Sequence, residues 1–274
     1  FAKSLMTAGW SPTAAVTARL LGGALVVAVV ATVVNRGWLR EALRHIKTVI
    51  AYGLVPVAGS QLCYYNAVAH LSVGVALLLE YAAPVLVVAW VWATTRRRPS
   101  NKTLAGVAMA VAGITVVLDV FSGAHINAIG VAWGVAAALC AACYFVMSGT
   151  VTADDSGLDP ITLAAGGLIV GSTAVALLGV FGILPLTFTS NNVEIAGLTT
   201  SWIVPIATLA IVSTAAAYVL GIRAVALLRP SFASLVGLAE VLSAVLWAWL
   251  LVGEAMTATQ AIGGAVVLAG LALA

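Results

Sequence analysis

The sequence predicts an all-α integral membrane protein, a ten-helix bundle of two inverted five-helix repeats whose first helix is mostly absent from this chain. Three observations support this. The chain is 63% hydrophobic and only 8% charged, whereas soluble globular chains are about 25% charged. Its apolar runs are about 20 residues long, which is the length that crosses a hydrocarbon core as a helix. The two halves also share a repeated pattern, described below.

Nine full spans are expected, in chain order, at residues 12–34, 48–70, 72–95, 103–121, 127–150, 160–182, 201–222, 231–251 and 257–274. Residues 1–8 are apolar but too short to cross, so we expect them to end a tenth helix that begins upstream. A cleaved signal peptide is the competing interpretation, but no charged leader and no small-residue cleavage site stand at the start. Barrel strands would alternate over about 10 residues, and no such alternation is present.

The loops predict the orientation of the spans, because cytoplasmic loops carry an excess of Lys and Arg. Loops 35–47, 96–102 and 223–230 hold ten of the 12 basic residues, and loops 183–200 and 252–256 hold none. We therefore assign the basic loops to the cytoplasm. Loop 152–159 is expected on the same side although it is acidic. The basic runs lie between membrane spans, which argues against a nucleic-acid partner.

A shift of 157 positions aligns the two halves of the chain. It places Trp90 and Trp92 on Trp247 and Trp249, and Gly106 and Gly113 on Gly263 and Gly270. The basic loop 96–102 then matches 253–259, which contains no Lys or Arg, so the charge changes side between the halves. A repeat of five helices enters the membrane from the opposite side the second time. The sequence therefore predicts inverted repeats over residues 1–122 and 123–274, with a substrate site at the midplane between them.

Glu80 is the principal candidate for that site. It lies in the apolar stretch LLLEYAAPVLVVAWVW (77–92), about 12 Å from the outer end of its helix at 1.5 Å per residue. A carboxylate exposed to lipid costs several kcal/mol, so it should face the bundle interior or a water-filled cavity. Glu240 has the corresponding role in the second half. We rank a functional role above a structural one for both.

Further polar and aromatic residues are predicted to share this cavity. The substrate-binding candidates besides Glu80 and Glu240 are Gln61, Tyr64, Tyr65, Asn66, Tyr81, Tyr144, Tyr218 and Trp247. Lipid-facing or packing roles stay open for Trp247. Two residues are gating candidates: Pro84 should loosen the backbone one turn after Glu80, and His70 lies at an outer bend, where a solvated cap is the competing role.

Other conspicuous residues have structural interpretations. Arg19 lies inside its span and is expected to snorkel toward the outer surface. Cys63, Cys140 and Cys143 are expected to be packing thiols, because no His or further Cys stands at metal-ligand spacing. The sequence contains no HExxH, GxSxG, Walker or dinucleotide motif. We therefore expect no metal, no cofactor and no enzymatic activity.

Three stretches resemble the EamA-type branch of the drug/metabolite transporter superfamily. They are FAKSLMTAGWSPTAAVTARLLGG (1–23), YYNAVAHLSVGVALLLEYAAPVLVVAW (64–90) and ALLRPSFASLVGLAEVLSAVLWAWLLVGEAMTATQAIGGAVVL (226–268). The resemblance implies a multi-pass protein of the bacterial inner membrane with cytoplasmic termini, acting as a monomer. In the family the second repeat commonly reads Glu-Pro, where this chain has Glu240 and Val241. That departure predicts a stiffer ninth helix.

Within that branch, VALLLEYAAPV (75–85) and LVGEAMT (251–257) are most similar to bacterial amino-acid exporters of the threonine/homoserine and aromatic types. The resemblance implies export of aromatic and other neutral amino acids, or related small metabolites, by alternating access. Multidrug, quaternary-amine and nucleotide-sugar transport within the superfamily are alternatives. A channel or scaffold locked by its carboxylates and an intramembrane enzyme are further alternatives, and proton coupling is left open.

The predicted site also suggests how an amino acid would bind. Its ammonium group would contact Glu80 or Glu240, with Tyr and Trp faces around the side chain. Its carboxylate would receive hydrogen bonds from Gln61, Tyr65, Asn66 and Tyr218.

Overall fold

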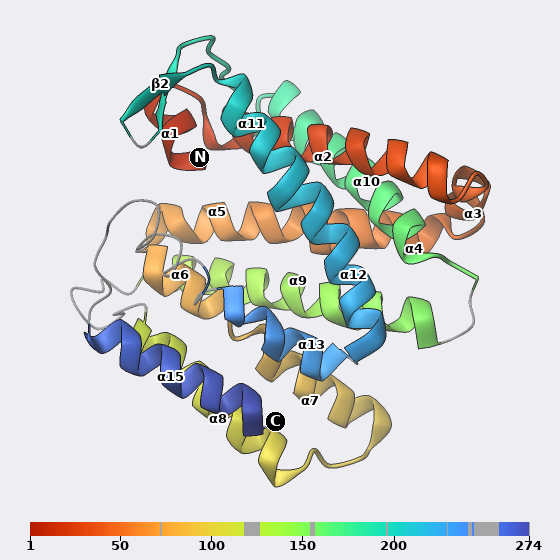
Figure 1. Ribbon diagram of the computed structural model, residues 1–274, viewed down its shortest axis with the longest axis vertical. Coiled ribbons are helices and arrows are strands. Elements are labelled where there is room, and N and C mark those ends of the chain that lie inside the picture. Colours follow the sequence, from red (N-terminus) through yellow and green to blue (C-terminus); the bar gives the residue numbers. More distant parts are fainter. Residues whose placement is uncertain are drawn as a thin grey trace. The chain divides into compact units, whose positions relative to one another are not determined.

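The computed structural model describes residues 1–71, 73–117, 127–153, 157–195, 197–228, 230–240, 243 and 258–273. These residues form helices connected by loops and one short β-hairpin (Figure 1). The chain divides into two compact units. Unit 1 contains Phe1–Gln61 and Met147–Leu227, and unit 2 contains Leu62–Val146 and Leu228–Ala274. Each unit therefore contains helices from both predicted repeats.

Unit 1 is built from the following elements: α1 (Ala2–Thr7), α2 (Pro12–Val34), α3 (Trp38–Arg44), α4 (Ile46–Tyr52), the π-helix η1 (Gly53–Gly59), α10 (Pro160–Val180), β1 (Val193–Ile195), β2 (Leu198–Thr200), α11 (Ile203–Ala210), the π-helix η2 (Ile211–Ala216) and α12 (Ala217–Leu228). Strands β1 and β2 pair antiparallel, with Val193 opposite Thr200. The sequence interpretation placed loops where α3 and this hairpin occur, and it did not predict the π-helices.

Unit 2 contains most of α5 (Ser60–His70), then α6 (Val73–Glu80), α7 (Ala83–Thr95), α8 (Asn101–Val117), most of α9 (Ala128–Ala153), α13 (Pro230–Gly237) and α15 (Ala258–Leu273). The chain passes between the units inside α5 and α9, and again at the end of α12. Both units are thus helical.

Six described helical segments are long and apolar enough to cross a membrane: Pro12–Val34, Ile46–Ala67, Val75–Thr95, Ala128–Gly149, Pro160–Val180 and Ile203–Leu228. These correspond to six of the predicted spans. The predicted spans 103–121 and 257–274 contain shorter apolar helices, Asn101–Val116 and Ala261–Gly270. Of the predicted span 231–251, residues 241–242 and 244–251 lie outside the described residues. Residues 1–8 contain helix α1; that they end a longer membrane-spanning helix stays a prediction.

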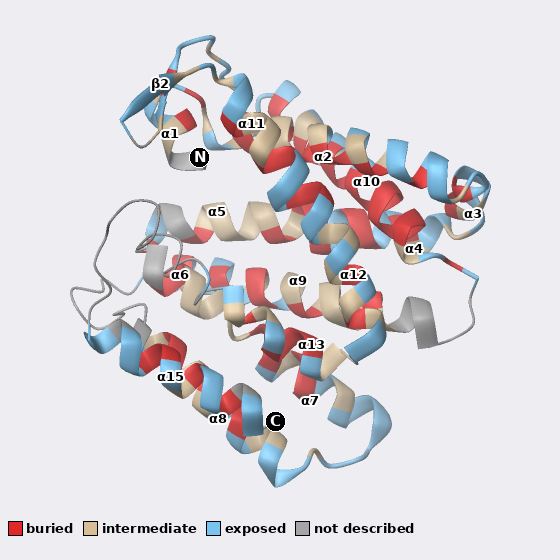
Figure 2. Ribbon diagram, in the orientation of Figure 1, coloured by how far each residue is buried: buried red, intermediate tan, exposed pale blue. Residues whose placement is uncertain are grey.

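Helix α2 shows why these helices suit lipid. One face of the helix is exposed: Leu21 is 47% and Leu25 is 67% exposed. The opposite face is buried: Leu20 is 0% and Ala24 is 4% exposed. Val29 and Val33 extend the exposed stripe at four-residue intervals. Helix α2 therefore carries apolar side chains on both its buried and its exposed face. Its backbone groups form hydrogen bonds within the helix, as a segment surrounded by lipid requires. Buried residues follow α10 along most of its length (Figure 2).

Helices α2 and α10 begin with the same local device. Ser11 and Asp159 are their N-caps, and a proline follows each cap at the first helical position. The Ser11 hydroxyl accepts a hydrogen bond from the Ala14 amide at 3.2 Å, and the Asp159 carboxylate accepts one from the Ile161 amide at 2.8 Å. Such caps satisfy amides that have no partner within the helix. The two devices are 148 positions apart.

The two helices run antiparallel within unit 1. At one end the Ser11 hydroxyl donates to the Pro185 carbonyl at 2.9 Å. At the other end the Asn35 amide donates to Thr162 at 3.4 Å, and Glu41 accepts a hydrogen bond from the Asp159 amide. The segment before α10 therefore lies at the same end of unit 1 as the basic loop 35–47. This agrees with the expectation that loop 152–159 shares its side.

Helices α8 and α15 pack closely in unit 2, also antiparallel. A Cβ added to Gly113 would lie 2.7 Å from the Gly263 carbonyl oxygen and 2.8 Å from the Val267 amide nitrogen. A Cβ added to Gly270 would lie 2.7 Å from the Gly106 carbonyl oxygen and 2.9 Å from the Ala110 amide nitrogen. The 157-residue shift converts one set of contacts into the other, because it relates Gly113 to Gly270, Gly106 to Gly263 and Ala110 to Val267. The glycines thus permit two backbones to touch, as in other membrane helix pairs.

Unit 1 contains a second pair of equivalent contacts. A Cβ on Gly23 would meet the Thr214 side chain at 2.5 Å, and a Cβ on Gly171 would meet the Val57 side chain at 2.5 Å. Val57 and Thr214 are 157 positions apart and lie in η1 and η2, respectively. The two π-helices therefore occupy matching positions in the two halves and pack on glycines in matching helices.

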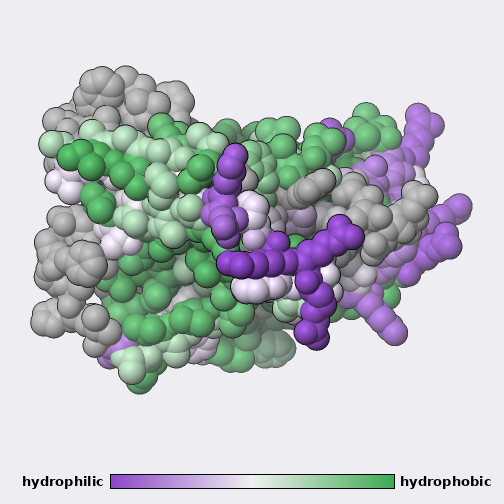
Figure 3. Space-filling model, turned by 90° about the horizontal axis from the view of Figure 1, so that it is seen from below, coloured by the Kyte–Doolittle hydropathy of each residue, from purple (hydrophilic) through white to green (hydrophobic). Residues whose placement is uncertain are grey.

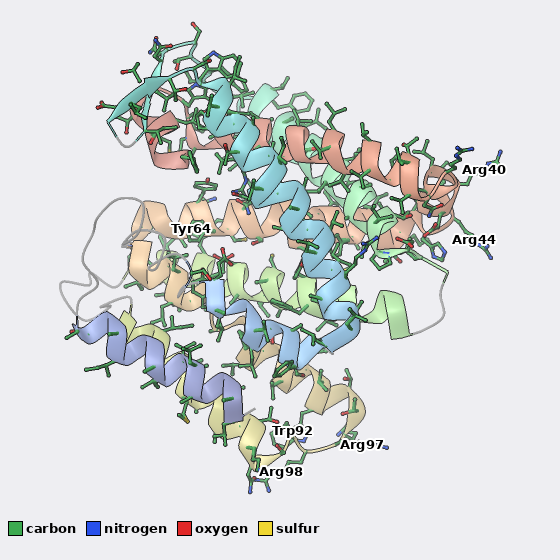
Figure 4. All side chains as sticks on the ribbon, in the orientation of Figure 1. Arg40, Arg44, Tyr64, Trp92, Arg97 and Arg98 are labelled. Atoms are coloured by element: carbon green, nitrogen blue, oxygen red, sulfur yellow. The ribbon has the colours of Figure 1, made fainter. Side chains whose placement is uncertain are left out.

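The basic residues of two loops are exposed. Arg36, Arg40, Arg44 and Lys47 are exposed in unit 1, and Arg96, Arg97, Arg98 and Lys102 are exposed in unit 2. Figure 4 shows Arg97 and Arg98 on the loop after α7, and Arg40 and Arg44 at α3. In Figure 3, strongly hydrophilic side chains gather in part of the visible face, while hydrophobic ones cover much of the remainder.

Candidate functional site

The helix that carries Glu80 is interrupted directly after it. Helix α6 ends at Glu80 and α7 begins at Ala83. The Ala82 amide bonds the Leu79 carbonyl at 3.1 Å, three residues back, so the helical pattern tightens there. Pro84 has no N–H to donate to the Glu80 carbonyl. The predicted loosening of the backbone by Pro84 is therefore present as a break at residues 81–82.

The second half has a break at the matching position. Helix α13 ends at Gly237, and Leu238 forms a turn whose amide bonds the Leu235 carbonyl at 3.0 Å. The expectation that Val241 would stiffen this helix did not foresee the interruption. Glycine within a helix costs about 1 kcal/mol relative to alanine, so Gly237 favours an end there without a proline.

Both breaks lie at one apolar cluster in unit 2. The buried members are Val88, Val107, Ala110, Ile114, Leu235, Leu238 and Val267, with Leu78, Leu104, Val111 and Tyr81 packed against them. Three pairs in this set are related by the 157-residue shift: Leu78 with Leu235, Tyr81 with Leu238, and Ala110 with Val267. The cluster fixes the two interrupted helices against α8 and α15.

Polar groups surround the first break. Glu80 is half-buried and lies within electrostatic range of Tyr64 on α5, Tyr81 after the break, and Cys140 on α9. Tyr81 also interacts with Glu240, which is exposed. The structure therefore brings four predicted site residues from three segments into one neighbourhood. We call Tyr64, Glu80, Tyr81 and Glu240 the carboxylate cluster.

Two further predicted site residues, Tyr65 and Tyr144, make aromatic contacts in unit 2. Tyr65 lies edge-on to Tyr64, with ring centroids 5.9 Å apart and an interplanar angle of 65°. Tyr144, one turn after Cys140, lies edge-on to Phe145 at 5.1 Å and 87°. Both tyrosines are half-buried. Figure 4 labels Tyr64, which α5 carries. Rings of this kind offer faces to a cation and apolar area to a side chain.

Other predicted residues are placed differently. Gln61 and Tyr218 belong to unit 1 rather than unit 2. The Asn66 side-chain amide donates to the Leu62 carbonyl of its own helix at 2.8 Å. His70 is exposed, and its Nδ1 is 2.9 Å from the Asn66 carbonyl oxygen. Trp247 lies outside the described residues.

A thiol pair lies beside the carboxylate cluster, which the sequence did not predict. Cys63 on α5 and Cys140 on α9 are hydrogen-bonded through their side chains, and Cys143 interacts with Cys140. Spacing along the chain gives no sign of this contact, because the two helices meet only in the folded protein. Within the described part of the chain, no group of three or more His, Cys, Asp or Glu residues is arranged to hold a metal ion.

Comparison with known proteins identifies the family. The model of the EamA-like transporter family matches residues 1–119 and 128–274. A solved structure, titled only as the crystal structure of a protein, has a TM-score of 0.78 and 18% sequence identity, over 99% of this chain and 91% of that chain. This likeness supports the fold alone. No curated protein matches the chain. The chain belongs to the EamA-like transporter family and is a multi-pass membrane transporter of small solutes.

Proposed function

We propose that this transporter exports amino acids, aromatic and other neutral ones, or related small metabolites by alternating access. The observation that carries the proposal is the carboxylate cluster at the interrupted helix of unit 2. A charged residue inside a membrane span is a functional-site hypothesis by default, because its burial is costly. Here Glu80 is half-buried with tyrosines around it, in a chain whose family transports solutes.

The cluster suits an organic ammonium group. A carboxylate forms charge-assisted hydrogen bonds with such a group, which are about twice as strong as neutral ones. Tyr64 and Tyr81 add ring faces that attract a cation. Tyr81 interacts with both Glu80 and Glu240. One solute ammonium bound near Tyr81 would therefore be attracted by two carboxylates.

The inverted repeat is part of the same proposal. It is supported by close contacts that occur in equivalent pairs in the two halves. One pair joins α8 and α15, and the other joins the π-helices to their partner glycines. Equivalent helices that pack antiparallel are what oppositely inserted repeats require. The first stretch that matches the family model ends at residue 119, and the second begins at residue 128. The proposed boundary between residues 122 and 123 lies between them.

Interrupted helices also fit a transport mechanism. Broken spans near the middle of a bilayer commonly line substrate sites in transporters, because irregular backbone is tolerated only beside protein or water. The breaks at Tyr81 and Leu238 flank the cluster in two matching helices. We propose that α6–α7 and α13 change angle at these breaks as the site opens to each side.

The proposed location is the bacterial inner membrane, with the basic loops and the C-terminus cytoplasmic and the protein monomeric. The positive-inside rule supports the sidedness of the loops. The antiparallel packing of α8 and α15 supports the placement of the C-terminus. It puts Gly270 beside Gly106, toward the α8 end that follows the basic loop 96–102.

Quaternary amines are the second candidate substrates, because an acidic site with aromatic faces also suits a cation without a carboxylate. A counterflow assay distinguishes the two. Pure protein in liposomes would be offered labelled phenylalanine, tyrosine, threonine, a polyamine and a quaternary amine. Uptake of amino acids with little uptake of the amines is expected. Uptake of amines alone would contradict amino-acid export and support multidrug transport.

A further inference from the structure

Helix α3 connects two membrane-spanning segments at one end of unit 1. The segment before it is Pro12–Val34, and the segment after it is Ile46–Ala67. A short helix between two consecutive spans lies where the chain leaves the hydrocarbon region and then enters it again, which is the level of the lipid headgroups. Helix α3 is therefore held near a membrane surface, whichever side of the membrane that surface is on.

One face of α3 is fixed to the rest of unit 1. Trp38 and Ala42, one turn apart, are buried. The Trp38 indole donates a hydrogen bond to the Thr32 hydroxyl, near the end of α2, at 3.0 Å. Between the two helices, the Asn35 side-chain amide donates to the Glu41 carboxylate at 2.7 Å. These contacts determine which side of α3 faces away from the protein.

The outward side of α3 carries an apolar pair. Leu39 is 59% exposed and Leu43 is 68% exposed. Residues four positions apart lie on the same side of a helix, so the two leucines form one apolar strip. Ile46 and Ile50, at the start of α4 and beyond its middle, are exposed as well. Contact with water disfavours such a strip, whereas the acyl chains directly below the headgroups favour it.

Basic side chains lie beside this strip. Arg40 and Arg44 each follow one of the leucines by one position and are exposed, so they form a second strip next to the first. Figure 4 shows both arginines extending outward from α3. The carboxylate of Glu41, the acidic residue of this helix, accepts hydrogen bonds from Asn35 and from the Asp159 amide. Among the described residues, no carboxylate forms an ion pair with either arginine.

A second copy of the chain matches this surface poorly. Two identical α3 faces would bring the arginines of one copy against those of the other, and like charges across an interface cost free energy. An anionic phospholipid matches both strips at once. Its phosphate has the charge and the planar pairs of oxygen atoms that a guanidinium binds in a bidentate arrangement, and its acyl chains offer apolar contact.

We infer that the outward face of α3 binds anionic phospholipid. Leu39 and Leu43 enter the boundary between headgroups and acyl chains, and Arg40 and Arg44 bind the headgroup phosphate. This inference concerns a surface within unit 1 and does not depend on which solute is transported. A free phosphate ion shares the headgroup's charge but not its acyl chains, so the test includes inorganic phosphate.

The test measures lipid binding to the purified full chain in a nonionic detergent. Native mass spectrometry would count bound phosphatidylglycerol or phosphatidylcholine during a lipid titration. The wild type should bind phosphatidylglycerol more tightly than phosphatidylcholine. Arg40→Gln/Arg44→Gln should weaken the binding of phosphatidylglycerol at least about tenfold, because each basic residue contributes separately to attraction by an anionic lipid surface. Leu39→Ser/Leu43→Ser should weaken the binding of both lipids by similar factors, because it removes apolar contact and leaves the charges.

Arg97→Gln/Arg98→Gln is the matched control. It removes the same charge from an exposed basic loop, but residues 93–103 contain no Leu, Ile, Val, Met, Phe or Trp. Its binding of phosphatidylglycerol should change less than about threefold, because charge without an apolar strip gives a weaker lipid contact.

Thermal unfolding in the same detergent provides a second measurement. Phosphatidylglycerol should raise the Tm of the wild type more than that of Arg40→Gln/Arg44→Gln, and inorganic phosphate should raise neither. Without lipid the two proteins should have the same Tm, because both arginines are exposed. Equal losses of phosphatidylglycerol binding in the α3 variant and the control would overturn the inference. Equal binding of the two lipids by the wild type, or equal stabilisation by inorganic phosphate, would overturn it too.

Discussion

Glu80 lies inside a membrane-spanning segment and has neighbours that can solvate it. Tyr64, Tyr81 and Cys140 come within its electrostatic range from three different segments. A carboxylate that only locked helices together would need these groups for stability and not for transport. A carboxylate that binds a solute ammonium would need its charge during transport. These two roles predict different consequences when the charge is removed and the shape is kept.

We expect Glu80→Gln to lower amino-acid counterflow by about tenfold or more, because a charge-assisted hydrogen bond is worth about 1.5–3 kcal/mol. The protein should remain folded, since the amide occupies nearly the same volume. Counterflow in proteoliposomes, with unfolding measured in parallel, provides the test. Glu194→Gln is the matched control, because Glu194 is exposed on β1. Unchanged transport in Glu80→Gln and Glu240→Gln would remove the carboxylate cluster from the mechanism.

At the scale of elements, the interrupted helix connects Glu80 to movement. Pro84 is buried one turn beyond the carboxylate and has no N–H for its carbonyl. Leu238 forms a matching interruption without a proline. Two devices therefore produce breaks at related positions. If α6–α7 bends there during transport, restoring the missing donor should slow the cycle.

Pro84→Ala is expected to reduce the maximal rate of transport several-fold while leaving the half-saturating solute concentration nearly unchanged. The new amide would donate to the Glu80 carbonyl and join α6 to α7, because an interior proline removes this type of hydrogen bond. Initial rates of counterflow over a range of solute concentrations would show the effect. Val85→Ala, at an exposed neighbouring position, is the control. An unaltered maximal rate would show that the break is only structural.

The contact between α8 and α15 permits a stability prediction. Gly113 and Gly270 each face a backbone carbonyl oxygen 2.7 Å from where a Cβ would lie. Gly113→Val and Gly270→Val should each lower the free energy of unfolding by about 1–3 kcal/mol, because overpacking forces backbones apart. The two losses should be similar, since the contacts are reciprocal. Ala108→Val, at an exposed position of α8, should have little effect.

Denaturant unfolding of the purified variants in detergent would measure these changes. A large loss for only one of the two glycine variants would be inconsistent with equivalent roles in the two halves. It would thereby weaken the inverted repeat, although the close contact itself would still hold.

At the scale of the whole molecule, the charge distribution predicts which loops face the cytoplasm. Single cysteines would be introduced into a cysteine-free protein by Arg40→Cys, Arg97→Cys and Glu194→Cys. In intact cells an impermeant maleimide should label only the third, because the basic loops are held inside. The first two should react after permeabilisation. If Arg40→Cys and Arg97→Cys reacted from opposite sides, the proposed topology would be wrong.

Much of the architecture follows from the sequence because its signals are local. Apolar runs of membrane-spanning length predict helices, since a bilayer offers backbone groups no other partners. Pro84 predicts a break because its chemistry is local as well. The 157-residue shift identified Gly106, Gly113, Gly263 and Gly270 as equivalent residues, and the structure places them in reciprocal contacts. Repetition in a sequence therefore anticipated a symmetric feature of the packing.

Contacts between distant segments required the tertiary structure. The sequence indicated Glu80 but not its neighbour Cys140. It did not predict the π-helices or the break at Leu238, because these depend on packing against glycines and apolar neighbours from other helices. Composition and periodicity determine that a segment spans the membrane. Only the close approach of helices decides which polar groups find partners, because that free energy belongs to pairs of segments.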